Sequence, residues 1–187
     1  MPCKIVFMGS PAFAVPALQR LIDSNHHVIS VFSQPPRPGG SRGMKEQKTP
    51  VHQLAENAGI PVRTPEKLTA EEVAFIEELK PDIIAVAAYG QYLPAGVINA
   101  APCINIHPSA LPRWRGAAPL NWTIMAGDKT TEVCIIAMGK GYDCGGVYAR
   151  KTLPLTADET AGSLHDKTAP LGADMLLDVI DNWDFYK

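Results

Sequence analysis

The stretch AAPCINIH, residues 100–107, is an apolar run that ends in a polar pair, and a proline- and arginine-rich loop, PSALPRWRG, follows it directly. We predict a buried strand over 100–107. Because side chains alternate across a strand, Asn105 and His107 should point to the same side. Open α/β folds place their active sites at the carboxyl ends of strands, so the pair indicates a candidate site. An isolated Asn-x-His pair is more often a hydrogen-bonded structural pair.

Strand-like and helix-like segments alternate on both sides of this stretch. This rhythm predicts a three-layer α/β/α sandwich of Rossmann-like form, with a mostly parallel sheet and helices on both faces. A short loop joins the last two strands, so we expect an antiparallel pair near the C-terminal half. The predicted strands are 4–8, 28–32, 61–63, 82–88, 100–107, 133–138 and 147–151, and the predicted helices are 12–24, 51–58, 70–79, 117–126 and 158–180, the last as one helix or two with a break near Pro170.

Length and composition limit the class of protein. The 187 residues fit one domain, and a net charge of −2 gives no global sign of nucleic-acid binding. The four cysteines include no Cys-x-x-Cys pair, which favours reduced thiols over a disulfide framework or a zinc site. The apolar run at 3–8 is too short for a signal peptide or a membrane span. We therefore expect a cytoplasmic monomer with no metal ion and no membrane partner.

The residue order from Asn105 to Pro119, NIHPSALPRWRGAAP, resembles the signature of the folate-dependent formyltransferases. A run of this length in a fixed order is far more specific than a three-residue motif. Its second half, RWRGAAP, is most similar to the members that act on methionyl-tRNA. The resemblance covers essentially the whole chain, and it implies that residues 1–187 form the catalytic domain with the formyltransferase fold.

The resemblance also implies a catalytic trio. In the family, an aspartate of a glycine-rich loop joins the Asn and the His of the strand, and Asp143 in GYDCGG stands at the matching position. Taken alone, Asp143 is explained about equally well as a turn residue. Asn105, His107 and Asp143 are therefore the candidate catalytic residues, whereas Cys144 is interpreted as a small filler.

The implied activity is transfer of the formyl group of 10-formyltetrahydrofolate to the amino group of methionyl-initiator tRNA. The attacking amine must be uncharged, and an α-amino group has a pKa of about 7.7–8.0. Attack on the formyl carbon gives a tetrahedral oxyanion, which Asn105 and protonated His107 would stabilise. Asp143 would orient His107 and help move the proton of the amine through a water. No covalent enzyme intermediate is needed.

Two segments match the folate-binding loops of the family, one after the strand at 82–88 and one after His107. Backbone groups of an irregular loop can pair with the flat pterin ring while apolar side chains sandwich it. Ala110 replaces the leucine that is more usual in the family, and without the resemblance Tyr89 and Tyr92 would be interpreted as simple packing. The predicted folate-binding residues are Tyr89, Gly90, Gln91, Leu93, Pro94, Ser109, Ala110, Leu111 and Pro112.

Basic residues indicate a tRNA contact. Residues 34–48 are predicted as a loop dense in Pro, Gly, Lys and Arg, and such a charge run is most often a solvated loop. In the family this position holds a loop that grips the tRNA acceptor stem, where Lys and Arg would contact phosphates with salt-sensitive affinity. The predicted tRNA-binding residues are Arg37, Arg42, Lys45, Lys48, Arg113 and Arg115.

The chain departs from the family pattern at both the site and the C-terminus. Gly139 and Gly146 stand where aspartates are common, which would loosen the loop that carries Asp143. Full-length members also carry a C-terminal β-barrel domain that helps hold tRNA, and this chain ends about where the linker would begin. An excised domain and a naturally short protein are both compatible with this ending.

Three other functions fit the same residues. One is formylation of a small amine, such as glycinamide ribonucleotide or an amino sugar, with the same donor. Another is hydrolysis of formyl-folate, with water in place of the amine. The third is a module that binds folate or RNA and catalyses nothing.

Overall fold

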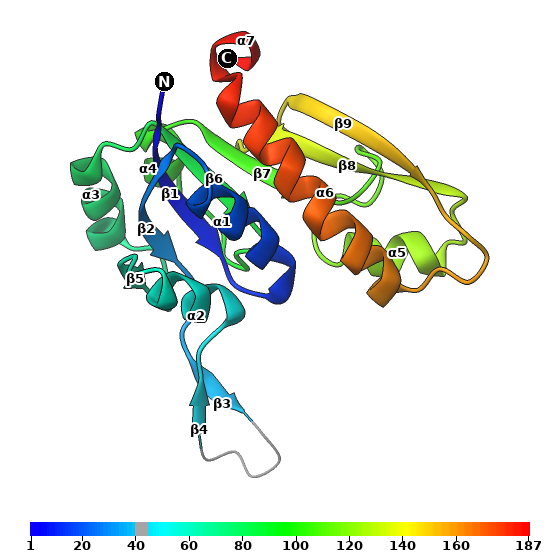
Figure 1. Ribbon diagram of the computed structural model, residues 1–187, viewed down its shortest axis with the longest axis horizontal. Coiled ribbons are helices and arrows are strands. Elements are labelled where there is room, and N and C mark those ends of the chain that lie inside the picture. The colour runs from blue at the N-terminus through cyan, green and yellow to red at the C-terminus, as the bar shows by residue number, and fades with distance from the viewer. Residues whose placement is uncertain (40–44) are drawn as a thin grey trace.

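A computed structural model of the chain describes residues 1–39 and 45–187. A sheet runs through the body with helices on both sides, and a small two-stranded ribbon projects from it (Figure 1). The large sheet has the strand order β5-β2-β1-β6-β7-β8-β9. Its strands are β1 Lys4–Gly9, β2 His27–Phe32, β5 Val62–Arg63, β6 Ile83–Ala87, β7 Cys103–His107, β8 Thr130–Ala137 and β9 Val147–Pro154.

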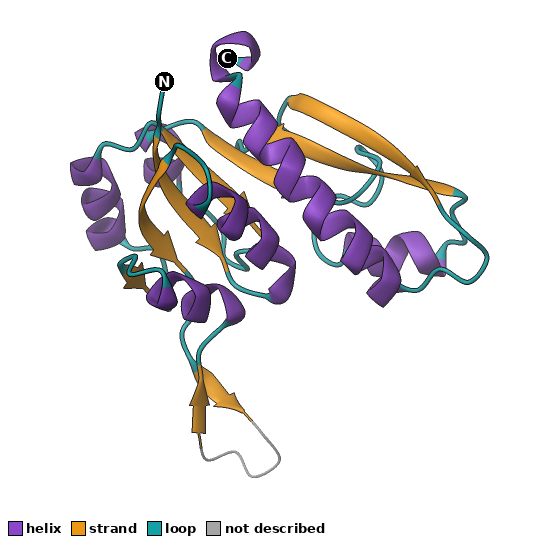
Figure 2. Ribbon diagram, viewed as in Figure 1, coloured by secondary structure: helices purple, strands orange, loops and turns teal. Residues whose placement is uncertain are grey.

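The helices alternate with these strands along the chain, as the sequence rhythm predicts (Figure 2). The ribbon consists of β3 Arg37–Gly39 and β4 Lys45–Gln47, which pair antiparallel. The helices are the 3₁₀ turn η1 Ala12–Ala14, α1 Val15–Ile22, α2 Pro50–Asn57, α3 Ala70–Leu79, α4 Ala95–Ala100, α5 Pro119–Met125, α6 Ala161–Asp181 and α7 Trp183–Tyr186.

Strand directions confirm the predicted sheet. The pairs β1–β2, β2–β5, β1–β6 and β6–β7 are parallel, whereas β7–β8 and β8–β9 are antiparallel. The short loop predicts only that the last two strands, β8 and β9, pair antiparallel. In the structure β7 and β8 are antiparallel as well. In this register Asn105 lies opposite Ile136 and His107 lies opposite Cys134.

Helices on both faces complete the three-layer sandwich. One face of the sheet packs against α1, α2 and α6, and the other packs against α3 and α4. Along β7 the two isoleucines, Ile104 and Ile106, lie in the cluster under α6, whereas Cys103 lies in the cluster under α4. Because side chains alternate, Asn105 and His107 share the face of Cys103 but lie further along the strand. The end of β7 thus presents two polar side chains beyond the helices that cover this face.

Two predicted segments are wrong near the site. Residues 100–102 are not strand, because the short helix α4 extends to Ala100 and β7 begins at Cys103. A helix of six residues is too short to show a clear apolar period, so no sequence pattern predicts it. Residues 34–48 are not a plain loop, because Arg37–Gly39 and Lys45–Gln47 form the ribbon β3–β4.

Helix boundaries also differ from the prediction. The helix predicted at 12–24 starts as η1, and α1 begins at Val15, which places Pro16 in its first turn where a missing N–H is tolerated. The helix predicted at 117–126 begins at Pro119, because Ala118 has a φ of 55° and cannot continue a helix. The last helix, α6, runs unbroken through Pro170. Its long buried face against the sheet compensates the cost of an interior proline, about 3 kcal/mol.

Candidate active site

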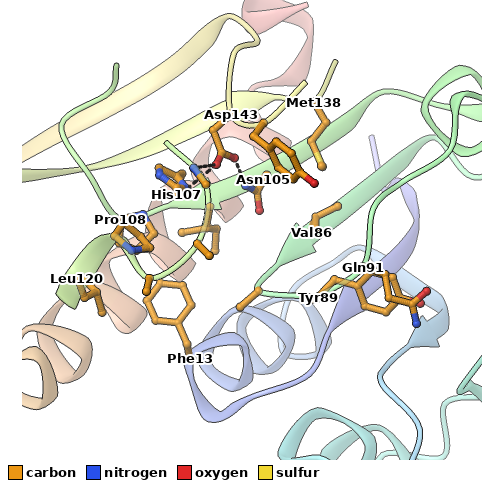
Figure 3. A pocket seen from close by; sticks show the side chains of 18 of the residues that line it. Phe13, Val86, Tyr89, Gln91, Asn105, His107, Pro108, Leu120, Met138 and Asp143 are labelled. Carbon is orange, nitrogen blue, oxygen red and sulfur yellow. Dashed lines mark hydrogen bonds and ion pairs between the residues drawn. The ribbon is translucent and has the colours of Figure 1, made fainter. Parts of the chain in front are cut away.

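A pocket of about 560 Å³ opens at the carboxyl ends of β6 and β7. Asn105 and His107 line it from β7 and are 9% and 4% exposed. Asp143 lines it from the loop between β8 and β9, and Figure 3 shows the three side chains pointing toward one another. The structure therefore brings together the three residues of the predicted trio, from two segments that lie far apart in the sequence.

Asp143 contacts both other residues of the trio through its carboxylate. One carboxylate oxygen, Oδ2, lies 3.4 Å from Nδ1 of His107 and accepts a hydrogen bond of 2.8 Å from the backbone N–H of Gly116. The other oxygen, Oδ1, accepts from Nδ2 of Asn105 at 3.4 Å. The two longer contacts exceed the usual range of about 2.7–3.2 Å. Contacts of this kind often tighten only when substrate binds.

The loop that carries Asp143 is held close to β8. Asp143 itself has a φ of 48°, a left-handed conformation that aspartate tolerates better than most residues. A Cβ atom on Gly145 would lie 1.8 Å from the backbone oxygen of Ala137, so glycine is required there. At Gly139 and Gly146 a Cβ would meet nothing within 4 Å. The two glycines that depart from the family pattern are therefore not demanded by the backbone, and each leaves room for a side chain.

His107 faces an acceptor at each ring nitrogen. Its Nε2 lies 2.9 Å from the backbone oxygen of Trp114, and its Nδ1 faces the carboxylate of Asp143. A carbonyl oxygen only accepts hydrogen bonds, so Nε2 carries a hydrogen. The ring donates at both positions only when both nitrogens are protonated. The geometry therefore suits an imidazolium next to the place where an oxyanion would form.

A network around Asp128 fixes the loop that supplies the Trp114 carbonyl. The carboxylate accepts two hydrogen bonds from Arg113, at 2.9 and 2.8 Å, and one from the indole N–H of Trp114 at 2.9 Å. These donors, Arg113 first, hold the pKa of Asp128 below its ordinary value. The Trp114 ring also stacks on Trp122 with 6.0 Å between centroids. Arg113 is thus engaged within the chain, although half of its side chain stays exposed, and Arg115 is exposed.

The first predicted folate-binding segment largely lines the pocket. Gly90, Gln91 and Leu93 do so together with Tyr89, whereas Pro94 lies outside the lining. The Tyr89 side chain is 2% exposed and packs in the core, where burial raises the pKa of its hydroxyl. Its backbone oxygen accepts from the Ser10 hydroxyl at 3.0 Å, which fixes the turn. The backbone of this loop, which the hydrogen bond from Ser10 holds in place, forms the wall of the pocket here.

The second predicted folate-binding segment lies behind the pocket. Ser109, Ala110, Leu111 and Pro112 are absent from its lining, while the preceding Pro108 is part of it. Ser109 is fully buried and donates a 2.7 Å hydrogen bond to the Arg113 oxygen. Leu111 packs against Cys134 and Ile136 of β8. In this structure the segment supports the loop that holds His107.

Other residues of the lining are not among the predicted site residues. One of them is His165, whose ring meets Phe13 edge-on at 5.7 Å between centroids. It comes from the start of α6, far from the trio in sequence, and a lone histidine on an amphipathic helix gives no functional signal. The remaining lining residues outside the predicted set include Phe13, Val86, Ala88, Tyr92, Leu120, Asn121, Met138 and Tyr142.

The predicted tRNA-binding residues of the ribbon lie apart from the trio. Arg37 and Lys45 are exposed on β3 and β4, and Lys48 pairs with Glu56 at 2.7 Å. Arg42 lies outside the described residues. A second pocket, of about 440 Å³, lies between the base of the ribbon and the first pocket. The two share the wall formed by Ala88, Tyr89 and Gly90.

Thiols and metal ligands do not assemble into a site in the described parts of the chain. All four cysteines are free thiols, and burial raises the pKa of Cys103 to about 12. Nowhere in residues 1–39 and 45–187 do three or more His, Cys, Asp or Glu side chains gather in a way that would hold a metal ion. Of the helices described, none combines the length and the apolar character needed to cross a membrane.

The sequence of the chain is similar to those of known proteins. A family described as formyl transferase matches residues 3–180. The methionyl-tRNA formyltransferase of Rickettsia bellii (strain RML369-C) is 50% identical over 184 residues, which cover 97% of this chain and 60% of that protein. The methionyl-tRNA formyltransferase of Paramagnetospirillum magneticum (strain ATCC 700264 / AMB-1) is 50% identical over 180 residues, covering 95% and 59%. The chain thus spans about 60% of the length of these curated relatives.

Solved structures share the fold at lower identity. The phosphoribosylglycinamide formyltransferase from Streptococcus pneumoniae TIGR4 superposes with a TM-score of 0.79 at 22% identity, covering 96% of this chain and 97% of that one. A sugar N-formyltransferase from Shewanella sp FDAARGOS_354 gives a TM-score of 0.73 at 19% identity, covering 98% and 71%. These matches show the fold and leave the acceptor of this chain to be argued from its own residues.

Proposed function

The chain belongs to the formyl transferase family, and from that premise we propose that it transfers the formyl group of 10-formyltetrahydrofolate to the amino group of methionyl-initiator tRNA. The observation that carries the proposal is the meeting of Asn105, His107 and Asp143 at one end of the pocket. The names of the relatives at about 50% identity support the choice of acceptor. So does the run RWRGAAP, which includes the loop contacting His107.

The reaction is direct acyl transfer. The uncharged amine attacks the formyl carbon, and a negative charge develops on the formyl oxygen. The amide of Asn105 has two N–H groups, of which one faces Asp143 and the other is left for that oxygen. His107 supplies positive charge beside it. Removing one donor from such a site costs about 10²–10³ in rate, which is the scale expected for Asn105.

Asp143 holds the side chains of Asn105 and His107 in position before substrate binds. Its carboxylate receives the backbone N–H of Gly116 and faces the side chains of Asn105 and His107. Fixed dipoles in a site shielded from water need little reorganisation during the reaction, which is the main source of electrostatic catalysis. Asp143 therefore holds the orientation of both partners, and it can pass a proton through pocket water.

The donor fits the wall formed by Tyr89, Gly90, Gln91 and Leu93. A pocket of about 560 Å³ lies within the range of about 300–1,000 Å³ typical of small-molecule sites. The backbone of the loop that carries these residues offers hydrogen-bonding groups to a flat heterocycle. Val86 and Met138 offer apolar contact from neighbouring segments. The formyl group would then extend toward the trio.

The acceptor would approach from the side of the ribbon β3–β4. Arg37 and Lys45 project there in solvent, where they can contact phosphates without reaching the trio. Affinity gained in this way falls as salt rises, because phosphate binding releases counterions.

The decisive experiment follows a labelled formyl group from 10-formyltetrahydrofolate to methionyl-initiator tRNA. We expect label on the tRNA, a loss of about 10²–10³-fold in Asn105→Ala, and no loss in Asn99→Ala, a matched exposed asparagine on α4. Parallel reactions contain glycinamide ribonucleotide, an amino sugar or no acceptor. Label on a small amine alone, formate release without acceptor, or folate binding without turnover would each contradict the proposal in favour of a different function.

A further inference from the structure

Exposed aromatic side chains gather around the pocket. Four large aromatic side chains are exposed in the described residues, and three of them belong to this region. Tyr92 and Tyr142 line the pocket, and Trp122 directly follows Asn121, which also lines it. Met125, almost one helical turn beyond Trp122 on α5, is exposed as well. Exposed apolar side chains that gather in this way mark a surface that binds a partner.

Trp122 is the outer member of a stacked pair of indoles. Its ring lies nearly parallel to that of Trp114, with 16° between the planes and 6.0 Å between the centroids. The indole N–H of Trp114 donates to Asp128 at 2.9 Å, and the guanidinium carbon of Arg113 lies 4.1 Å from the centroid of the Trp114 ring. The inner indole is therefore fixed, whereas the side of the pair formed by Trp122 is 48% exposed.

The pair is connected directly to the proposed catalytic residues. Trp114 has a φ of 59°, a left-handed conformation that a bulky residue rarely adopts. With this backbone its carbonyl oxygen lies 2.9 Å from Nε2 of His107, while its indole stacks on Trp122. Residues held in such strained conformations cluster at functional sites. The aromatic surface thus begins within one residue of a group that contacts the catalytic histidine.

The charges beside the pair favour a nucleic acid as the partner. Arg115, next to Trp114, is exposed and forms no ion pair with any described residue. The carboxylate that contacts the pair, Asp128, is balanced by the guanidinium of Arg113. Positive charge beside exposed aromatic rings is the combination that binds single-stranded nucleic acid, because every base has a face that can stack.

We propose that Trp122, supported by Trp114, stacks on an unpaired base at the 3′ end of the acceptor tRNA, an inference that rests on the proposed function. A tRNA carries its amino acid on the last nucleotide of this unpaired end. When the methionyl amine enters the pocket, the last nucleotides therefore lie beside its rim. Arg115 would contact a phosphate there. Trp122 touches no reacting atom, so it is a positioning residue for the acceptor.

The test compares how two RNAs bind to the chain and to its variants. One is methionyl-initiator tRNA, and the other is the same tRNA trimmed of its unpaired 3′ nucleotides. We expect Trp122→Ala to raise the Kd for the first by about five- to hundredfold, and to leave the Kd for the trimmed tRNA unchanged. Trp122→Phe keeps a ring and should recover most of the affinity. Phe185→Ala is the matched control, because Phe185 is also an exposed aromatic residue but lies on α7, at the opposite end of α6 from α5 (Figure 1).

Formyl transfer, measured in parallel, separates positioning from chemistry. Trp122→Ala should raise the KM for methionyl-initiator tRNA, whereas kcat/KM for methionine methyl ester, which offers the same amine without RNA, should not fall. An equal rise in Kd for both RNAs, no rise, or no recovery in Trp122→Phe would overturn the stacking role. So would loss of self-association in Trp122→Ala with unchanged tRNA binding, which would assign the surface to a second copy of the chain. In these cases formylation of methionyl-initiator tRNA by the unsubstituted chain would keep the proposed function intact. Absence of that formylation would overturn the proposed function, and this inference with it.

Discussion

The proposed catalytic end of the pocket, formed by Asn105, His107 and Asp143, and the basic ribbon β3–β4 are built in opposite ways. In the first, Asn105 and His107 are buried and Asp143 is half-buried, and contacts from separate segments of the chain fix each side chain. The second consists of two strands of three residues that project from the body, with Arg37 and Lys45 in solvent (Figure 1). Both regions were expected to act on the same substrate.

The difference follows from what each region has to do. Stabilising a developing charge requires donors that are already in place, since reorganisation during the reaction costs rate. Contacting phosphates requires only positive charge within reach, because the interaction is long-range and weakly directional. Substitutions at the catalytic end should therefore change kcat for every acceptor. Substitutions in the ribbon should change KM for tRNA alone.

The largest effect is expected at the centre of the catalytic end. His107→Asn removes the charge beside the oxyanion and the donor to the Trp114 carbonyl. We expect kcat/KM to fall by about 10²–10³-fold with tRNA and with methionine methyl ester alike. Circular dichroism should show a folded chain. Activity within threefold of the unsubstituted chain would remove His107 from the mechanism.

The second effect tests how tightly the Asp143 loop must be held. In Gly145→Ala the new Cβ would lie 1.8 Å from the Ala137 oxygen, so the loop must move and carry Asp143 with it. A displacement of about 1 Å can cost about 10²-fold in rate, which is the loss we expect in kcat. Gly146→Ala is the matched control, because its Cβ meets nothing within 4 Å, and it should stay near full activity. Equal losses in the two variants would show that the contact with β8 is unimportant.

A smaller and more selective effect is expected in the ribbon. The double variant Arg37→Gln/Lys45→Gln should raise KM for methionyl-tRNA by about three- to tenfold at low salt and reduce the salt dependence. Its kcat/KM for methionine methyl ester should not change. A matching loss with the small ester would instead place the ribbon in the chemistry, and the contrast between the two regions would disappear.

The smallest effect concerns stability. Hydrogen bonds from Arg113 and then Trp114 hold the pKa of Asp128 below its ordinary value of 3.8. A lowered folded-state pKa stabilises the protein above pH 3.8, and this contribution is lost as pH falls through the folded-state pKa. Asp128→Asn should therefore lower the Tm slightly near neutral pH, and the difference in Tm should vanish in acid. A constant difference across pH would mean that the charge of Asp128 contributes nothing.

Local rules account for the two residues of the trio that lie on β7. The alternation of side chains predicts that Asn105 and His107 share one side, and the structure places both in the pocket. The place of Asp143 in the trio is predicted by the resemblance alone. No local feature of a glycine-rich turn predicts which strand end the turn will contact. The strand prediction also began three residues early, since the short helix α4 has no period long enough to detect.

Other parts of the site depend on distant packing. The segment from Ser109 to Pro112 was predicted to contact folate, yet it lies behind the pocket lining and supports the loop that ends at Trp114. His165 could not be predicted, because its position depends on how α6 crosses the sheet next to η1.

The sequence by itself determined most of the order of strands and helices, without α4 and the ribbon β3–β4, together with the face of β7 that carries polar residues and the family to which the chain belongs. These properties depend on near neighbours in the chain, through side-chain alternation, apolar periodicity and a fixed order of residues. Only the tertiary structure decided which side chains meet around the pocket and which stand behind it. Such meetings depend on strand register and helix packing between segments far apart in sequence, and no local pattern encodes them.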